Sequence, residues 1–129
     1  MFSVDNMKQI TDTHGEKAWD DVLKILTMRT RNSFKQGTLL ARYSDAKFVI
    51  TLPNAKYETA VKFAGQMQKK IKDTRFETPK GLKIHVSISL AIATKTDTAK
   101  TLRDIVVNAE KELSSVQASG SGKVVSTKA

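Results

Sequence analysis

The stretch LLARYSDAKFVITLP, residues 39–53, has the pattern of two short strands joined by a tight turn. Its apolar residues are Leu39, Leu40 and Tyr43 before the bend and Phe48, Val49, Ile50 and Leu52 after it. Between them, Ser44 and Asp45 are residues that favour turns, whereas Ala46 and Lys47 are not. The stretch therefore predicts a β-hairpin whose tip either carries chemistry or only reverses the chain.

The segments around this hairpin show helical and strand periodicities. Apolar residues recur at helical spacing over Glu16–Lys35, Tyr57–Asp73 and about Ala99–Val116. Residues 82–92 alternate between apolar and polar, which predicts one long strand. Val4 and Val124-Val125 suit short strands at the two ends of the chain. This order predicts one α/β domain with a strand-helix-strand-strand-helix-strand core.

Composition limits the classes of function that the chain can have. Its 129 residues suffice for one domain with a hydrophobic core. No apolar run approaches the roughly 20 residues that span a bilayer, so we expect no insertion into a membrane. Cysteine is absent, which excludes a disulfide, a thiol nucleophile and a thiolate metal site, and favours a cytoplasmic location.

A net charge of +9 is the strongest signal in the composition. Such a charge favours acidic proteins, nucleic acid or acidic lipid as partners. Few aromatic residues are present to stack on bases, so we rank nucleic acid below an acidic protein. The candidate interaction patch consists of Lys69, Lys70, Lys72 and Arg75. The simpler alternative is that these residues form a solvated basic surface.

Four stretches together carry a resemblance to a known family. They are VDNMKQITDTHGEKAWDDVL (residues 4–23), ARYSDAKFVITLP (41–53), VSISLAIAT (86–94) and NAEKEL (108–113). In order and spacing they resemble the D-x-D-x-F-K-x-I-N-D opening, the A-R-Y-G-G-D/E-E-F hairpin, the V-S-x-G-I-A strand and the A-D-x-A-L helix of GGDEF (diguanylate cyclase) domains. The resemblance extends over essentially the whole chain.

The resemblance implies a fold and a domain organisation. The expected fold is α/β (α+β), with a palm-like central mixed, largely antiparallel sheet flanked by helices. Residues 1–129 would form a single degenerate GGDEF-type domain. The family's usual first helix and its D-x-L-T-x-L motif are missing before Met1, so we expect the chain to be a piece of a longer multidomain protein.

Enzymes of this family join two GTP molecules into cyclic di-GMP, with divalent metal ions held by carboxylates. The resemblance places those carboxylates at positions 3 and 46, where this chain has Ser3 and Ala46. Ser44 and Asp45 replace the two glycines of the signature, and Lys47 replaces its second acidic residue. Asp5 is retained, but the resemblance does not make it a metal ligand. We therefore expect no metal, no cofactor and no catalysis: a pseudoenzyme.

The residues that bind the nucleotide in the family are only partly retained. Thr11 replaces the asparagine that reads the guanine, whereas Lys8 and Asp20 match the family pattern. A lysine and an arginine that bind phosphate are replaced by Gln117 and Ser121. The R-x-x-D motif of the inhibitory site reads Lys35 to Thr38, without its arginine and aspartate. Binding of GTP or cyclic di-GMP is therefore expected to be weak or absent.

These features predict a non-catalytic GGDEF domain that acts as a regulatory or protein-interaction module in bacterial cyclic di-GMP-related signalling. Two alternatives remain open. A residual sensor of GTP or a cyclic dinucleotide would depend on Lys8 and Asp20. A basic nucleic-acid-binding module would depend on the charge of +9.

Overall fold

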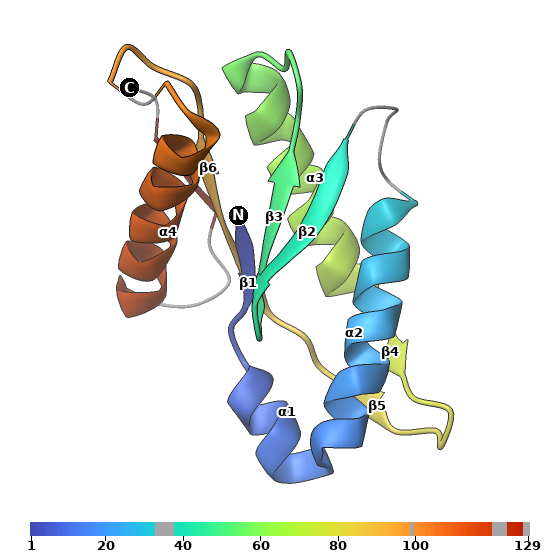
Figure 1. Ribbon diagram of the computed structural model, residues 1–129. Helices are drawn as coiled ribbons and strands as arrows, with labels where there is room; N and C mark the ends of the chain where they lie inside the picture. Colours follow the sequence, from blue (N-terminus) through green and yellow to red (C-terminus); the bar gives the residue numbers. More distant parts are fainter. Residues whose placement is uncertain (33–37, 99, 120–123, 128–129) are drawn as a thin grey trace.

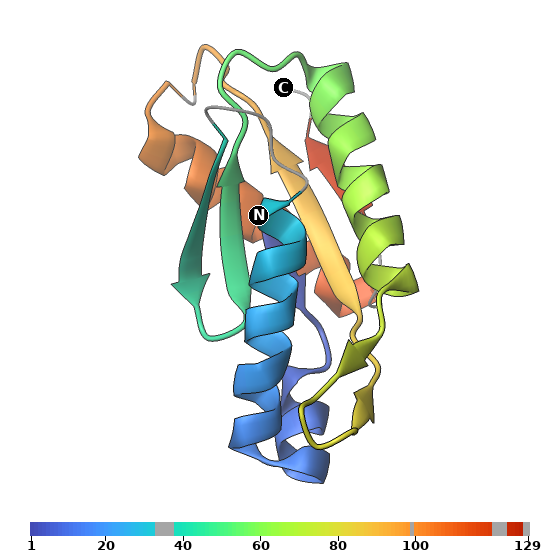
Figure 2. The same ribbon diagram turned by 90° about the vertical axis from the view of Figure 1, so that its right-hand side faces the viewer.

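The computed structural model describes residues 1–32, 38–98, 100–119 and 124–127, and arranges them in three layers. A five-stranded sheet forms the middle layer. Helices α2 (Glu16–Arg31) and α3 (Tyr57–Asp73) cover one face, and α4 (Leu102–Ser119) covers part of the other (Figures 1 and 2). The short helix α1 (Met7–His14) lies at the end where β1 leaves the sheet (Figure 1).

The sheet has the strand order β2-β3-β1-β6-β7. Its strands are β1 (Phe2–Val4), β2 (Leu39–Ser44), β3 (Lys47–Thr51), β6 (Ile88–Ala93) and β7 (Val124–Thr127). Neighbouring strands are antiparallel except β6 and β7, which are parallel. This confirms the predicted mixed, largely antiparallel sheet flanked by helices.

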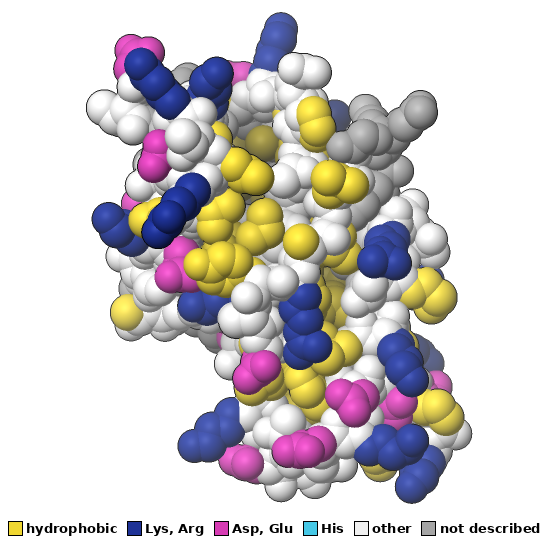
Figure 3. All heavy atoms as spheres, viewed as in Figure 1, with side chains coloured by type: hydrophobic (Ala, Val, Ile, Leu, Met, Phe, Trp, Pro, Cys, Tyr) yellow, Lys and Arg dark blue, Asp and Glu magenta, His cyan; other side chains and the backbone are white. Residues whose placement is uncertain are grey.

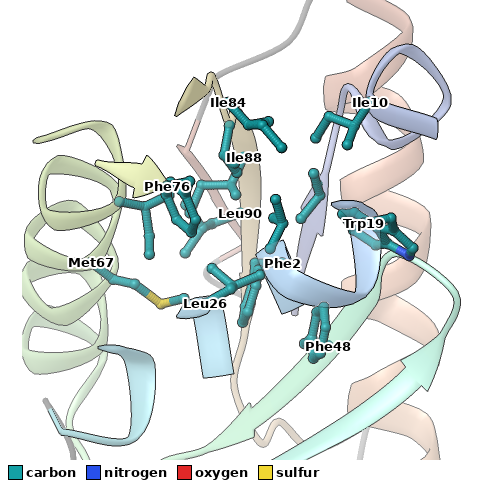
Figure 4. Close-up of a cluster of buried hydrophobic side chains, with 14 of the residues drawn as sticks. Phe2, Ile10, Trp19, Leu26, Phe48, Met67, Phe76, Ile84, Ile88 and Leu90 are labelled. Atoms are coloured by element: carbon teal, nitrogen blue, oxygen red, sulfur yellow. The ribbon is translucent and has the colours of Figure 1, made fainter. Parts of the chain in front are cut away.

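The hydrophobic core lies between the sheet and helices α2 and α3 (Figure 4). Phe2 on β1 and Phe48 on β3 stack with their ring centroids 4.9 Å apart, so the two strands are joined by side chains as well as by their ladder. Leu26 of α2 and Met67 of α3 point towards this pair from the helical layer (Figure 4). Because β1 contributes Phe2 and Val4 to the core, the residues that alternate with them face α4 instead.

Several predicted elements agree closely with the structure. The hairpin forms as β2 and β3, the helix Tyr57–Asp73 has the predicted bounds as α3, and β7 includes Val124-Val125. The first predicted helix, Glu16–Lys35, forms as α2 and ends at Arg31, and its residues 33–35 lie outside the described residues. Trp19 is buried, as its place on the apolar face of this helix predicts.

The single strand predicted over residues 82–92 is wrong. The structure divides it into β5 (Lys83–Ile84) and β6, and pairs β5 with β4 (Phe76–Glu77) in a separate hairpin. The cause is Asn6, whose amide nitrogen donates to the carbonyl of His85 (2.7 Å) and whose amide oxygen accepts from the Ser87 N–H (3.1 Å). These bonds engage the backbone of residues 85–87, which separates β5 from β6.

Helix α1 was not predicted, because only one of its residues, Ile10, is buried and its apolar pattern is correspondingly short. It is separated from α2 by Gly15, whose φ of +90° lies in a region that favours glycine. This conformation ends one helix and starts the next within a single residue. No helix among the described residues is long and apolar enough to cross a membrane.

Candidate functional site

The hairpin tip is held by backbone-directed bonds. Arg42 donates through Nη2 to the carbonyl of Asp45 (2.7 Å) and through Nε to that of Ser44 (3.4 Å). The ladder is irregular between Arg42 and Ser44, as at a β-bulge, and the Val4 N–H donates to the carbonyl of Ala46 (2.9 Å). The described contacts of the tip therefore serve its own shape and its attachment to β1.

Ser3 lies on β1 and is only 3% exposed. Its direct cross-strand partners are Lys47 on β3 and Ser89 on β6, so these side chains share one face of the sheet. Ala46, at the hairpin tip, is half-buried, packs against the hydrophobic core and contributes only a methyl group. Neither position supplies the carboxylate oxygen that a hard cation requires. Among the described residues, no group of three or more His, Cys, Asp or Glu side chains is arranged to hold a metal ion.

Asp5, just after β1, is the centre of the polar contacts at this end of the sheet. Its Oδ2 accepts from the Ser89 hydroxyl (2.8 Å) and, at 3.5 Å, from the Ser87 hydroxyl, and its Oδ1 accepts from Nε2 of Gln117 (3.0 Å). The carboxylate thus connects β1, β6 and α4. Ser89 is fully buried, so its hydroxyl needs such a partner.

No pattern in the sequence predicts this network. The family resemblance marks Gln117 only as the loss of a phosphate-binding lysine, and it implies no role for Asn6 or Ser89. Asp5 and Gln117 are 112 residues apart, and no local pattern connects them. The one available signal was an Asp-Asn pair directly after a buried strand, where polar side chains commonly bond to neighbouring backbone.

The residues that match the family's nucleotide contacts lie on α1 and α2. Lys8 and Asp20 are exposed, and the Thr11 hydroxyl donates to the carbonyl of Lys8 (3.0 Å) within its own helix. Trp19 lies beside Asp20 in sequence, but its side chain is buried in the core. The two side chains that match the family pattern, Lys8 and Asp20, are thus accessible, whereas the Thr11 hydroxyl is bonded to the backbone of its own helix.

The other sequence-predicted sites have different outcomes. Of the degenerate inhibitory site, Lys35 lies outside the described residues, and Thr38 is half-buried just before β2. Ser121 also lies outside the described residues. The candidate interaction patch is brought together at one end of α3, where Lys69, Lys70, Lys72 and Arg75 are all exposed.

The face of the sheet beside α4 also carries an ionisable pair that the sequence did not predict. Tyr43 on β2 forms a side-chain hydrogen bond with Glu110 on α4. That bond, and then the negative charge of Glu110, raise the pKa of the Tyr43 phenol above its usual value, while Arg103 acts in the opposite direction. In the sequence pattern, Tyr43 is only one of the apolar residues of the predicted strand.

An apolar groove of about 450 Å³ is lined by residues of α3, α4, the sheet and the segment that follows β3. Its lining includes Val49, Ala91, Ile105, Val106 and Ala109. Figure 3 shows apolar side chains gathered on this face between α4 and the β2–β3 hairpin. The exposed Leu102, which is 63% accessible, lies at its edge.

Comparison with known proteins gives a family match over most of the chain. The family model described as diguanylate cyclase, GGDEF domain, matches residues 1–123. Diguanylate cyclase A of Treponema denticola is 27% identical over 128 residues, which cover 99% of this chain and 34% of that protein. The response regulator PleD of Caulobacter vibrioides is 24% identical over 126 residues, 97% of this chain and 28% of that protein. The chain thus spans about a third or less of these two relatives.

Solved structures share the fold. The GGDEF domain of YfiN (TpbB) from Pseudomonas aeruginosa superposes with a TM-score of 0.89 at 22% identity, covering 99% of this chain and 80% of that one. The active GGEEF domain of a diguanylate cyclase from Vibrio cholerae superposes with a TM-score of 0.81 at 21% identity, with the same coverage. At sequence identities of 22% and 21%, these similarities show a shared fold only.

Proposed function

The chain belongs to the family of diguanylate cyclase GGDEF domains, and from that premise we propose that it is a non-catalytic member of the family. It would act in cyclic di-GMP-related signalling as a regulatory or protein-interaction module, with a cytoplasmic location. Its fold would serve as a rigid scaffold for contact with another protein, since function belongs to sites on a fold and not to the fold itself.

The observation that supports this proposal most strongly is the chemistry at positions 3 and 46. Ser3 is buried between Lys47 and Ser89, and Ala46 offers a methyl group. The divalent ions that the family implies do not fit these residues, because such ions are held mainly through carboxylates and neither residue supplies one. Lys47 adds a positive charge to the same face, which disfavours a divalent cation there.

The state of the nucleotide contacts supports weak or absent binding of GTP. The amide of Gln117 bonds to Asp5, and the Thr11 hydroxyl bonds to its own helix. Lys8 and Asp20 remain exposed as possible contacts for a residual sensor. Calorimetric titration with GTP and with cyclic di-GMP, each with Mg²⁺, separates these readings. We expect no heat of binding, whereas micromolar binding that is lost in Lys8→Ala and Asp20→Ala would establish the sensor.

The proposed contact surface is the basic patch at the end of α3, formed by Lys69, Lys70, Lys72 and Arg75. All four side chains are exposed, and a concentrated positive charge speeds encounter with an acidic partner. Such attraction weakens with salt, because the Debye length falls from about 8 Å at physiological ionic strength to about 3 Å at 1 M. The proposed partner is therefore an acidic protein.

The role of this patch is testable by affinity capture from a lysate of the source cells, at low and high salt, after nuclease treatment. The variant Lys69→Glu, Lys70→Glu, Lys72→Glu should lose the partner. A control variant, Lys17→Glu, Lys24→Glu, Lys111→Glu, makes the same change in net charge at exposed positions elsewhere and should retain it. Equal retention by both variants would reduce the patch to a solvated surface. Bound material that disappears with nuclease would favour a nucleic-acid-binding module.

A further inference from the structure

The contacts of Asp5 point to an internal lock between the end of β1, β6 and the last turn of α4. The carboxylate of Asp5 lies between the Ser89 hydroxyl of β6 and the Gln117 amide of α4, at 2.8 and 3.0 Å. We propose that these bonds hold the C-terminal turn of α4 against β1 and β6 in the free protein. The last turn of α4 is then ordered whether or not nucleotide is present.

The chemistry of the two donors suits such a lock. A carboxylate that accepts hydrogen bonds from neutral donors makes charge-assisted bonds, which are stronger than bonds between neutral groups. Asp5 and Gln117 are both half-buried and Ser89 is fully buried, so water competes poorly for these contacts. Both oxygens of the carboxylate are engaged, and neither donor brings a positive charge that would attract phosphate.

The junction that carries Asp5 is itself fixed from several directions. The Asp5 N–H donates to the carbonyl of Ser87 (2.8 Å), and Asn6 bonds to the backbone at His85 and Ser87. The backbone that carries the accepting carboxylate of Asp5 is therefore itself fixed by hydrogen bonds. On α4, Leu113 and Val116 are buried, so apolar packing holds the helix against the sheet, and the Gln117 bond adds a polar contact in the last turn.

This inference deepens the proposed function, because it assigns the order of the last turn of α4 to contacts within the chain and not to bound nucleotide. It rests on the proposed function only in assuming that GTP does not displace Gln117. The lock is tested by amide protection in the free protein, whereas the proposed function is tested by formation of cyclic di-GMP and by capture of a partner. The two proposals can therefore fail separately.

Amide hydrogen exchange over residues 113–118 tests the lock. Gln117→Leu removes the donor but keeps a side chain of similar size, and should lower protection of this segment about tenfold, the effect of losing one charge-assisted bond. Gln117→Glu places a second carboxylate beside Asp5 and should lower it further. Ser114→Ala, at an exposed position on the same helix, is the control and should leave it unchanged.

The same measurement on the unaltered chain includes an excess of GTP with Mg²⁺, which should leave the protection of residues 113–118 unchanged. Protection in Gln117→Leu equal to that of the unaltered chain would overturn the proposal. So would a tenfold gain of protection in the unaltered chain on addition of nucleotide, since the helix end would then depend on ligand. Asp5→Asn, which keeps an acceptor oxygen but loses the charge, should lie between the unaltered chain and Gln117→Leu.

Discussion

Replacing Ser3 by the carboxylate that the family has at this position should destabilise the protein. Ser3 is 3% exposed and lies against Ser89 and Lys47, with the Asp5 carboxylate two residues further along the same face. Burial and the neighbouring negative charge would both raise the pKa of the introduced carboxyl group, and Lys47 would offset only part of this. A rise of about two units corresponds to about 2.7 kcal/mol at neutral pH.

Urea denaturation of Ser3→Asp at pH 7 should therefore show a loss of roughly 2–3 kcal/mol in the free energy of unfolding relative to Ser3→Asn, the uncharged control. The folded state binds the proton more tightly, so the penalty should be absent below pH 4 and grow as the pH rises through the raised pKa. Mg²⁺ should not restore stability. An ion that bound here at one hundred times its dissociation constant would restore about 2.7 kcal/mol, and such a rescue would refute the reasoning.

Three further predictions follow from particular contacts. In a spectrophotometric titration, Tyr43 should ionise above the usual range for tyrosine, and Glu110→Gln should lower the pKa of Tyr43. Because the pKa of Tyr43 is higher in the folded than in the unfolded state, this pair stabilises the fold below about pH 10. That stabilisation is lost as the pH rises through the pKa of the folded state. An unchanged titration in Glu110→Gln would contradict the pair. Trp19→Ala should cost about 3–5 kcal/mol in chemical denaturation because Trp19 is buried in the core, whereas Lys17→Ala, at an exposed position, should change stability little. Cyclic di-GMP should not bind at the degenerate inhibitory site, because Lys35 to Thr38 supply neither an arginine nor an aspartate; micromolar binding abolished by Lys35→Ala would show the opposite.

Local patterns predicted the elements whose stability depends on a periodic apolar face. The hairpin, α3 and the buried position of Trp19 are of this kind, and all were confirmed. The single strand predicted over residues 82–92 was wrong. The alternation of apolar and polar residues is present there, but side-chain bonds from Asn6 hold residues 85–87 outside any strand. Those bonds join positions 79 and 81 residues apart in sequence, beyond the reach of a pattern.

The candidate site was predictable only in part, for a similar physical reason. The residue types at Ser3 and Ala46 can be read from the sequence once the family resemblance is stated. The sequence shows that Asp5 is retained but does not predict its partners, because its donors come from β6 and α4. Which polar groups satisfy one another depends on how the layers pack, so the Asp5–Gln117 contact emerged only from the three-dimensional arrangement.

The most direct test of the proposed loss of catalysis is the formation of cyclic di-GMP itself. The purified chain is incubated with GTP and either Mg²⁺ or Mn²⁺, with an active diguanylate cyclase in parallel, and the products are separated by chromatography. We expect no cyclic di-GMP from this chain, nor from the variant Ser3→Asp, Ala46→Asp, in which Thr11 and Gln117 still leave the nucleotide poorly held. Clear turnover by the unaltered chain would contradict the account, because Ser3 and Ala46 would then support a reaction for which they supply no metal ligand.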